Sequence, residues 1–128
     1  MKGSTSIFSV KRIWNAVGYS IEGFKSAFRT ETAFRQEVVL SLALVPVILF
    51  LDVTAKSKLM LAGSLFLVLF AELINSAIEA VVDRVSFERH ELSKKAKDIG
   101  SAIVFLALVY AAIIWAVILW PLFSDGFV

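Results

Sequence analysis

Residues 59–83 read LMLAGSLFLVLFAELINSAIEAVVD, an apolar stretch that carries Glu72, Glu79 and Asp83 in its second half. A helix turns by about 100° per residue, so these three acids lie within roughly 20° of one line along the helix. A carboxylate at membrane depth costs roughly 2.5–3.5 kcal/mol on insertion scales. We therefore expect this acidic stripe (Glu72, Glu79 and Asp83) to be functional.

The composition indicates a membrane protein. The chain has 128 residues, of which 59% are hydrophobic, whereas soluble domains are about 45–50% apolar. It contains no cysteine, which excludes disulfides and thiolate metal sites. The formal net charge of +2 does not indicate a nucleic-acid partner, and we expect none. Charged residues interrupt the N-terminal apolar residues, so we expect no cleaved signal peptide.

The apolar stretches predict an all-α membrane protein with a single domain over residues 1–128. About 20 apolar residues cross a bilayer, and three segments qualify as transmembrane helices: 34–51, 59–83 and 98–123. Pro46 should kink the first of them. Residues 6–33 alternate apolar and charged side chains at steps of three and four, which predicts an amphipathic helix on the membrane surface.

Basic residues predict the orientation. They gather before Val38 and in the loop between the last two spans, namely Lys2, Lys11, Arg12, Lys25, Arg29, Arg35, Arg84, Arg89, Lys94, Lys95 and Lys97. The positive-inside rule places both regions, and the N-terminus, in the cytoplasm. Trp115, Trp120 and Phe123 then fit an aromatic belt at the outer boundary.

With this orientation the acidic stripe points toward the cytoplasm. Asp98 and Lys97 begin the next span on the same side, and Glu31 and Glu37 bracket the end of the surface segment. Mg²⁺ binds through one or two carboxylates plus substrate phosphates, and a carboxyl group in an apolar setting suits a general base. There is no GxxxxGK[ST] or GxGxxG motif. These features favour phosphoryl transfer from a soluble nucleotide to a lipid hydroxyl.

Other interpretations stay open at this point. Asn75 is also suited to hydrogen-bonding one helix to another, for about 0.6 kcal/mol on average. The loop lysines and arginines also serve as topology determinants, and His90 is equally a solvated side chain. A proton or cation channel, or a non-enzymatic scaffold subunit, would use the same stripe.

Several motifs together resemble the prokaryotic diacylglycerol kinase family. They are AELINSAIEAVVDR at 71–84, HELS at 90–93, AKDIGSA at 96–102, GYS at 18–20 and AFRQE at 33–37. The resemblance extends from about Arg12 to Trp120. It implies a homotrimeric kinase of the bacterial cytoplasmic membrane, which moves the γ-phosphate of ATP to diacylglycerol and forms phosphatidate. Its sites would form between subunits, and its partners would be diacylglycerol and membrane lipids. A sister branch phosphorylates undecaprenol with the same acids, so that activity is the alternative.

The resemblance also implies roles for individual residues. Glu72 would be the general base, and Glu31 and Glu79 would bind Mg²⁺. The nucleotide would be held by Arg12, Tyr19, Glu31, Glu79, Glu88, His90, Lys97 and Asp98. The lipid would be contacted by Arg35, Gln36, Glu37, Glu72, Asn75, Ser101 and Trp115. Arg89 stands where family members often carry an aromatic residue, which bears on nucleotide preference.

Overall fold

The described part of the chain folds into four α-helices and contains no strand. The computed structural model describes Ile7 and residues 9–124, so Lys2 and Ser6 of the predictions above lie outside it. The helices are α1 (Val10–Thr30), α2 (Thr32–Phe50), α3 (Ala55–Val85) and α4 (Glu91–Ser124). The last three are long and apolar enough to cross a membrane. The predicted class, an all-α protein with three membrane helices, is confirmed. The association of three chains stays a prediction.

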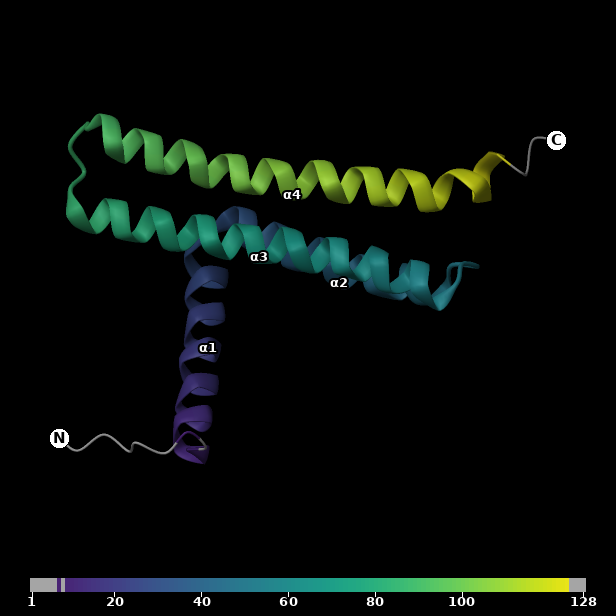
Figure 1. The fold of residues 1–128 in the computed structure, drawn as a ribbon, viewed down its shortest axis with the longest axis horizontal. Helices are drawn as coiled ribbons and strands as arrows, with labels where there is room; N and C mark the ends of the chain where they lie inside the picture. Colours follow the sequence, from purple (N-terminus) through teal and green to yellow (C-terminus); the bar gives the residue numbers. More distant parts are fainter. Residues whose placement is uncertain (1–6, 8, 125–128) are drawn as a thin grey trace.

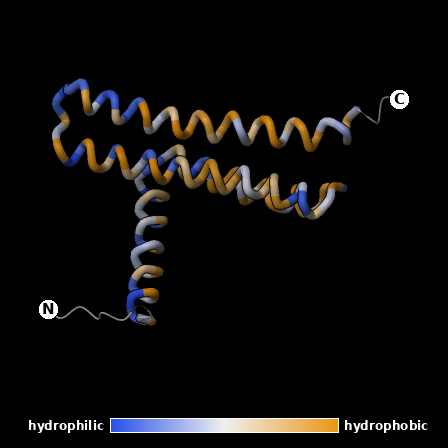
Figure 2. Tube along the Cα trace, in the orientation of Figure 1, coloured by the Kyte–Doolittle hydropathy of each residue, from blue (hydrophilic) through white to orange (hydrophobic). Residues whose placement is uncertain are grey.

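Three helices run side by side, and the fourth leaves them steeply. α3 and α4 form a long antiparallel hairpin, α2 lies along α3, and α1 projects away from the bundle (Figure 1). The buried core is small: it consists of one cluster around Ile48, Leu61 and Leu65 and a second around Val68, Ala71 and Ala107. α2, α3 and α4 are apolar along most of their length (Figure 2), and many of their large apolar side chains are exposed. Such apolar surfaces require lipid or another protein surface to cover them.

Local capping makes two helices longer than their apolar stretches predict. The Thr54 hydroxyl accepts a hydrogen bond from the Ser57 N–H at 3.1 Å, so α3 begins at Ala55 and not at 59. His90 Nδ1 accepts from the Leu92 N–H at 3.1 Å, and α4 therefore begins at Glu91 and not at 98. The charged residues 91–97 thus form a helical extension of the hairpin.

The corner between α1 and α2 is a single extended residue, Glu31. The guanidinium of Arg35 donates from Nη1 to the carbonyl oxygens of Phe28 at 3.2 Å and Arg29 at 3.3 Å. These carbonyls belong to the last turn of α1, where no intrahelical donor remains. Arg35 therefore ties the end of α1 to the start of α2. α2 itself continues through Pro46 to Phe50.

A polar contact joins α3 to α4 inside the bundle. Trp115 Nε1 donates to the Ser64 hydroxyl at 3.0 Å, and that hydroxyl donates to the Leu61 carbonyl at 2.6 Å. Ser64 is fully buried and Trp115 half-buried. The indole N–H of Trp115 is thus used within the hairpin, and the place of Trp115 in an aromatic belt at the outer boundary stays a prediction. Trp120 and Phe123 are exposed.

We predict that Ser64→Ala lowers the free energy of unfolding by about 0.6 kcal/mol and by less than about 2 kcal/mol, as for other hydrogen bonds between membrane helices. The measurement is reversible unfolding in mixed micelles. Ser20→Ala is the control, because the Ser20 hydroxyl is exposed and, among the described residues, bonds only to the Ala16 carbonyl of its own helix. Equal losses in the two variants would show that the Trp115 contact adds no stability.

Candidate active site

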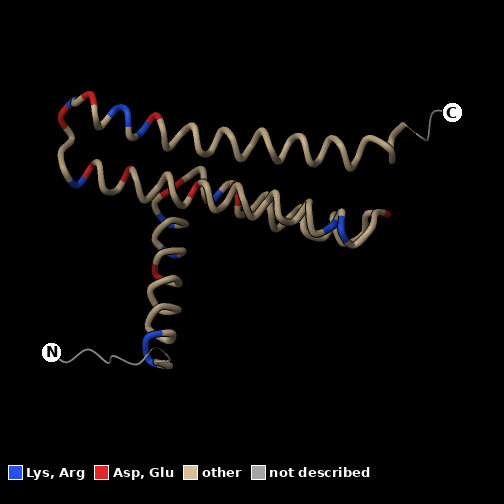
Figure 3. Tube along the Cα trace, viewed as in Figure 1, with Lys and Arg blue, Asp and Glu red and all other residues tan. Residues whose placement is uncertain are grey.

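The charged residues of the bundle gather toward one end. Acidic and basic residues concentrate around the α3–α4 loop and along the part of α3 next to it, a smaller group lies at the α2–α3 turn, and most of α4 carries none (Figure 3). This distribution follows from the charged extension of α4 at residues 91–97 and from the acids in the second half of α3. The site is therefore built at this end.

Glu72 is the acid buried most deeply in the bundle. It is 7% exposed, and the negative charges of Glu37, Glu79 and Glu31 all act on its carboxylate. α2 packs along α3 and brings Glu37 there, while the extended corner supplies Glu31. We call these four residues the acid cluster. The predicted gathering of acids from several segments is thus present within one chain.

No cation is paired with Glu72 in the described part of the chain. The ion pairs found there involve Glu22, Asp83 and Asp98 instead. Burying a charge is costly unless a partner compensates for it. A buried carboxylate of this kind is suited to take up a proton or to lie near a bound cation.

Asn75 lies one turn beyond Glu72 and touches the second acid of the stripe. Its Nδ2 donates to Glu79 Oε1 at 3.4 Å. Its Oδ1 is buried and has no hydrogen-bond partner among the described residues. The alternative role for Asn75, a hydrogen bond between helices, is therefore not seen in this part of the chain. Asn75 acts instead on Glu79.

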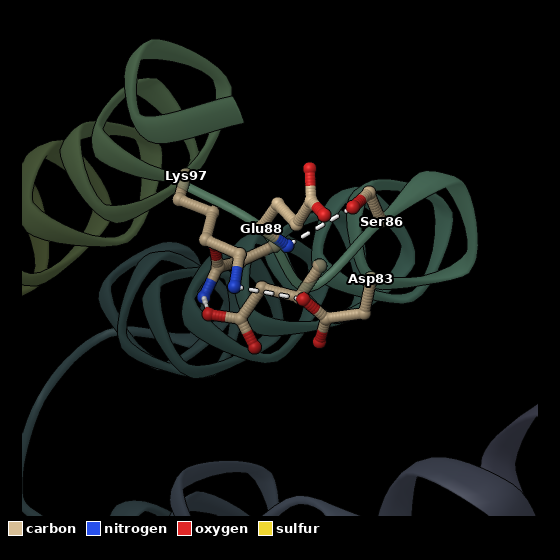
Figure 4. Close-up of polar contacts among 6 residues, drawn as sticks. Asp83, Ser86, Glu88 and Lys97 are labelled. Carbon is tan, nitrogen blue, oxygen red and sulfur yellow. Dashed lines mark hydrogen bonds and ion pairs between the residues drawn. The ribbon is translucent and has the colours of Figure 1, made fainter. Parts of the chain in front are cut away.

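A hollow of about 650 Å³, lined mostly by charged and polar residues, lies at the α3–α4 loop. Four residues that the resemblance assigned to the nucleotide line it together: Glu88, His90, Lys97 and Asp98. Lys97 Nζ lies 2.8 Å from Asp83 Oδ1, and the Glu88 N–H donates to the Ser86 hydroxyl at 3.0 Å (Figure 4). We call this hollow the loop pocket.

The lysines of the loop pocket are held as cations. The hydrogen bond to Asp83 raises the pKa of Lys97, and the hydrogen bond to Asp98 raises the pKa of Lys94. Lys94 Nζ lies 2.6 Å from Asp98 Oδ2. Sequence reasoning left Lys94 out of the site, although its spacing of four residues from Asp98 on a helix was the available signal. The pocket therefore presents stable positive charge beside the acids.

Three predicted site residues, Arg12, Tyr19 and Trp115, do not line the loop pocket of a single chain. Arg12 is near the start of α1, and its 18 positions to Thr30 correspond to about 27 Å. The start of α1 points away from the hairpin (Figure 1). Tyr19, also on α1, is 75% exposed. Trp115 lies 17 positions after Asp98 on α4, about 25 Å along the helix. One chain does not bring these three to the loop pocket.

The other predicted lipid contacts lie nearer to the acid cluster in the sequence. Gln36 precedes Glu37 on α2 and is exposed, and Ser101 is exposed one turn into the apolar part of α4. Arg35, as described above, already binds the carbonyls that end α1. Its guanidinium is therefore committed in part to the corner.

The donor set suits a hard cation bound jointly with phosphate. Among the described residues, no three Asp, Glu or His side chains lie close enough to hold a metal ion by themselves. Mg²⁺ normally takes only one or two carboxylates and completes its shell with water and substrate phosphates. Glu79 and Glu31 meet that requirement in number and in ligand type.

Comparisons with known proteins agree with this arrangement. The family described as prokaryotic diacylglycerol kinase matches residues 18–119. The diacylglycerol kinase of Pseudomonas aeruginosa is 55% identical over 106 residues, which cover 83% of this chain and 84% of the relative. That of Escherichia coli K12 is 49% identical over 107 residues, covering 84% and 86%. That of Helicobacter pylori is 42% identical over 92 residues, covering 72% of each. The matched region contains the acid cluster and the loop pocket.

Proposed function

The chain belongs to the prokaryotic diacylglycerol kinase family and is a lipid kinase, and we propose that it transfers the γ-phosphate of ATP to the 3-hydroxyl of diacylglycerol, forming phosphatidate. One observation carries the proposal most directly. Glu72 is buried among three other acids and has no cation paired with it in the described residues. A group in that state is suited to receive the proton of a lipid alcohol.

In the proposed reaction Glu72 is the general base. As its carboxylate accepts the proton of the lipid 3-hydroxyl, the hydroxyl oxygen bonds to the γ-phosphorus. The bond between that phosphorus and the β–γ bridging oxygen breaks, and ADP leaves. The protein's main contribution to such a transfer is to position the groups and stabilise the charge. The apolar surroundings of Glu72 admit the lipid, whose glycerol end lies at the interface.

Glu79 and Glu31 are the residues that we propose to hold Mg²⁺. The charges of both act on Glu72, which supports a position beside the reacting groups. The bound cation would supply positive charge against the phosphates. The Asn75 hydrogen bond orients Glu79, as partners of metal-binding carboxylates commonly do.

The loop pocket is the proposed site for the remainder of ATP. Lys97 and Asp98 would meet its phosphate end, and Glu88 and His90 would hold the rest. The ion pair with Asp83 keeps Lys97 at the rim. Arg12 and Tyr19 would complete the site from a neighbouring subunit, since α1 extends away from its own loop pocket. This separation supports a homotrimer with sites between chains.

We propose that the lipid approaches from the bilayer side of Glu72. Arg35, Gln36, Glu37, Asn75, Ser101 and Trp115 would contact it. The basic residues near α1 and the α3–α4 loop support a cytoplasmic position for both. The enzyme would accordingly act at the inner face of the bacterial cytoplasmic membrane, with its N-terminus in the cytoplasm.

A lipid panel tests this function. Purified protein in mixed micelles receives γ-labelled ATP and Mg²⁺ with diacylglycerol, with undecaprenol, or with no added acceptor. We expect labelled phosphatidate with diacylglycerol and no lipid product in the other two samples. Label in undecaprenol alone would replace the proposed substrate. ATP turnover without any labelled lipid would remove the kinase assignment.

A further inference from the structure

Among the glycines of the described chain, Gly100 of α4 has the least free space around its Cα, because α3 packs closely against it. A Cβ built at Gly100 would collide with Asn75 Oδ1, and it would lie 3.4 Å from Asn75 Cγ and 3.6 Å from Ile78 Cδ1. At Gly18, Gly23 and Gly63 the same construction meets nothing within 4 Å. Gly100 is buried. The missing side chain is therefore what makes room for the Asn75 carboxamide.

The nitrogen of the Asn75 carboxamide makes a hydrogen bond, and its oxygen makes none among the described residues. Nδ2 donates to Glu79 Oε1, while Oδ1 faces Gly100 and has no partner among the described residues. A freely turning carboxamide would bring its oxygen to a donor, because leaving a buried acceptor unpaired is unfavourable. Turning it over would also set Oδ1 against the Glu79 carboxylate, and two acceptors repel. Gly100 on one side and Glu79 on the other thus determine how Asn75 lies.

We propose that Gly100 is a positioning residue that acts through Asn75 on the orientation of the Glu79 carboxylate. α4 contributes no side chain to this contact, yet its backbone confines the carboxamide that holds Glu79. The inference rests on the proposed function for the role of Glu79 in binding Mg²⁺. It adds a residue on α4 to a metal site otherwise built from α3 and the α1–α2 corner.

The substitution Gly100→Ala tests this idea because of what the new methyl group meets. Its closest contact is the tip of a side chain and not backbone, so the carboxamide shifts while α3 and α4 stay packed. The shift breaks the Nδ2 hydrogen bond to Glu79. We expect the KM for Mg²⁺ to rise by about 10-fold or more, the effect typical of losing an outer partner of a metal ligand. Excess Mg²⁺ should restore part of the activity.

A direct readout of Asn75 accompanies the kinetics. The chain contains two asparagines, Asn15 and Asn75, so labelling with ¹⁵N-asparagine produces two side-chain amide signals in micelles. Gly100→Ala should move the Asn75 signal and leave the signal of Asn15, on α1, in place. Gly63→Ala is the matched control: it also adds a methyl group to a membrane helix, and it should change neither signal nor the KM for Mg²⁺.

The two measurements distinguish a failure of this inference from a failure of the proposed function. An Asn75 signal that does not move in Gly100→Ala overturns the inference, and so does a moved signal with an unchanged KM for Mg²⁺. If instead Glu79→Gln leaves the KM for Mg²⁺ unchanged, the metal assignment under the proposed function has failed. The position of the Asn75 signal still reports whether Gly100 confines the carboxamide.

Discussion

Replacing Glu72 with Gln will lower kcat for phosphate transfer to diacylglycerol by about 10²- to 10⁴-fold, the usual contribution of a general base. The change keeps the size of the side chain and removes its capacity to take up a proton. It also removes one negative charge from the acid cluster, so we expect the folded state to be kept. Steady-state kinetics in mixed micelles measure the loss.

Two controls accompany Glu72→Gln. Binding of ATP in the presence of Mg²⁺ should stay within a few-fold of the unsubstituted protein, because Glu72 is not assigned to the nucleotide. Glu22→Gln removes an acid whose side chain is 76% exposed on α1, and it should leave kcat unchanged. Near-normal turnover in Glu72→Gln would rule out the base assignment.

Glu79→Gln should weaken the binding of Mg²⁺ and leave the proton transfer to Glu72 unaffected. We expect the KM for Mg²⁺ to rise by at least about 10-fold, since the loss of even an outer partner costs about 10- to 100-fold. Because the defect is in binding, raising the Mg²⁺ concentration should recover part of kcat, whereas it should do nothing for Glu72→Gln. Initial rates over a Mg²⁺ series at fixed ATP make this comparison.

Asp52→Asn is the control for Glu79→Gln. Asp52 is an exposed acid in the turn between α2 and α3, away from the end where the acids gather. Its loss should leave the Mg²⁺ series unchanged. If Glu79→Gln lowers kcat at every Mg²⁺ concentration with no change in KM, the carboxylate serves the reaction in some way other than by binding the metal.

Most of the fold could be predicted from the sequence because its signals are local. Length and apolar content identify a membrane helix without reference to any neighbour, and the amphipathic pattern of α1 is equally local. The helix ends were predicted less well. Thr54 and His90 extend α3 and α4 through hydrogen bonds to backbone N–H groups, and a count of apolar residues does not register such caps.

The acidic stripe was predictable for the same reason, since helix periodicity alone aligns Glu72 with Glu79. The approach of Glu31 and Glu37 to Glu72 was less accessible, because it depends on how α2 packs along α3. The predicted orientation placed these acids at the same membrane boundary, but no pattern within one segment encodes the packing that brings them to Glu72. Gly100 was missed as a site residue. A glycine inside an otherwise apolar helix was the signal. Its contact with Asn75 depends on how α4 packs against α3, which the sequence does not show.

Trp115 shows what a local signal leaves out. A tryptophan near the end of a membrane helix is usually an interfacial anchor, yet here its indole N–H reaches Ser64 on the facing helix. That partner is a buried serine 51 positions earlier in the chain, and the local signal does not predict it. The roles of Arg12 and Tyr19 stay predictions, because neither residue lines the loop pocket of a single chain.

One measurement tests most directly the claim that acids are kept in an apolar bundle in order to phosphorylate a lipid. Protein carrying both Glu72→Gln and Glu79→Gln is reconstituted into vesicles containing diacylglycerol, and the label passed from γ-labelled ATP into extracted lipid is compared with that of the unsubstituted protein. We predict that labelled phosphatidate falls to background while the substituted protein stays folded in the vesicles. Phosphatidate formed at the unsubstituted rate would contradict the account.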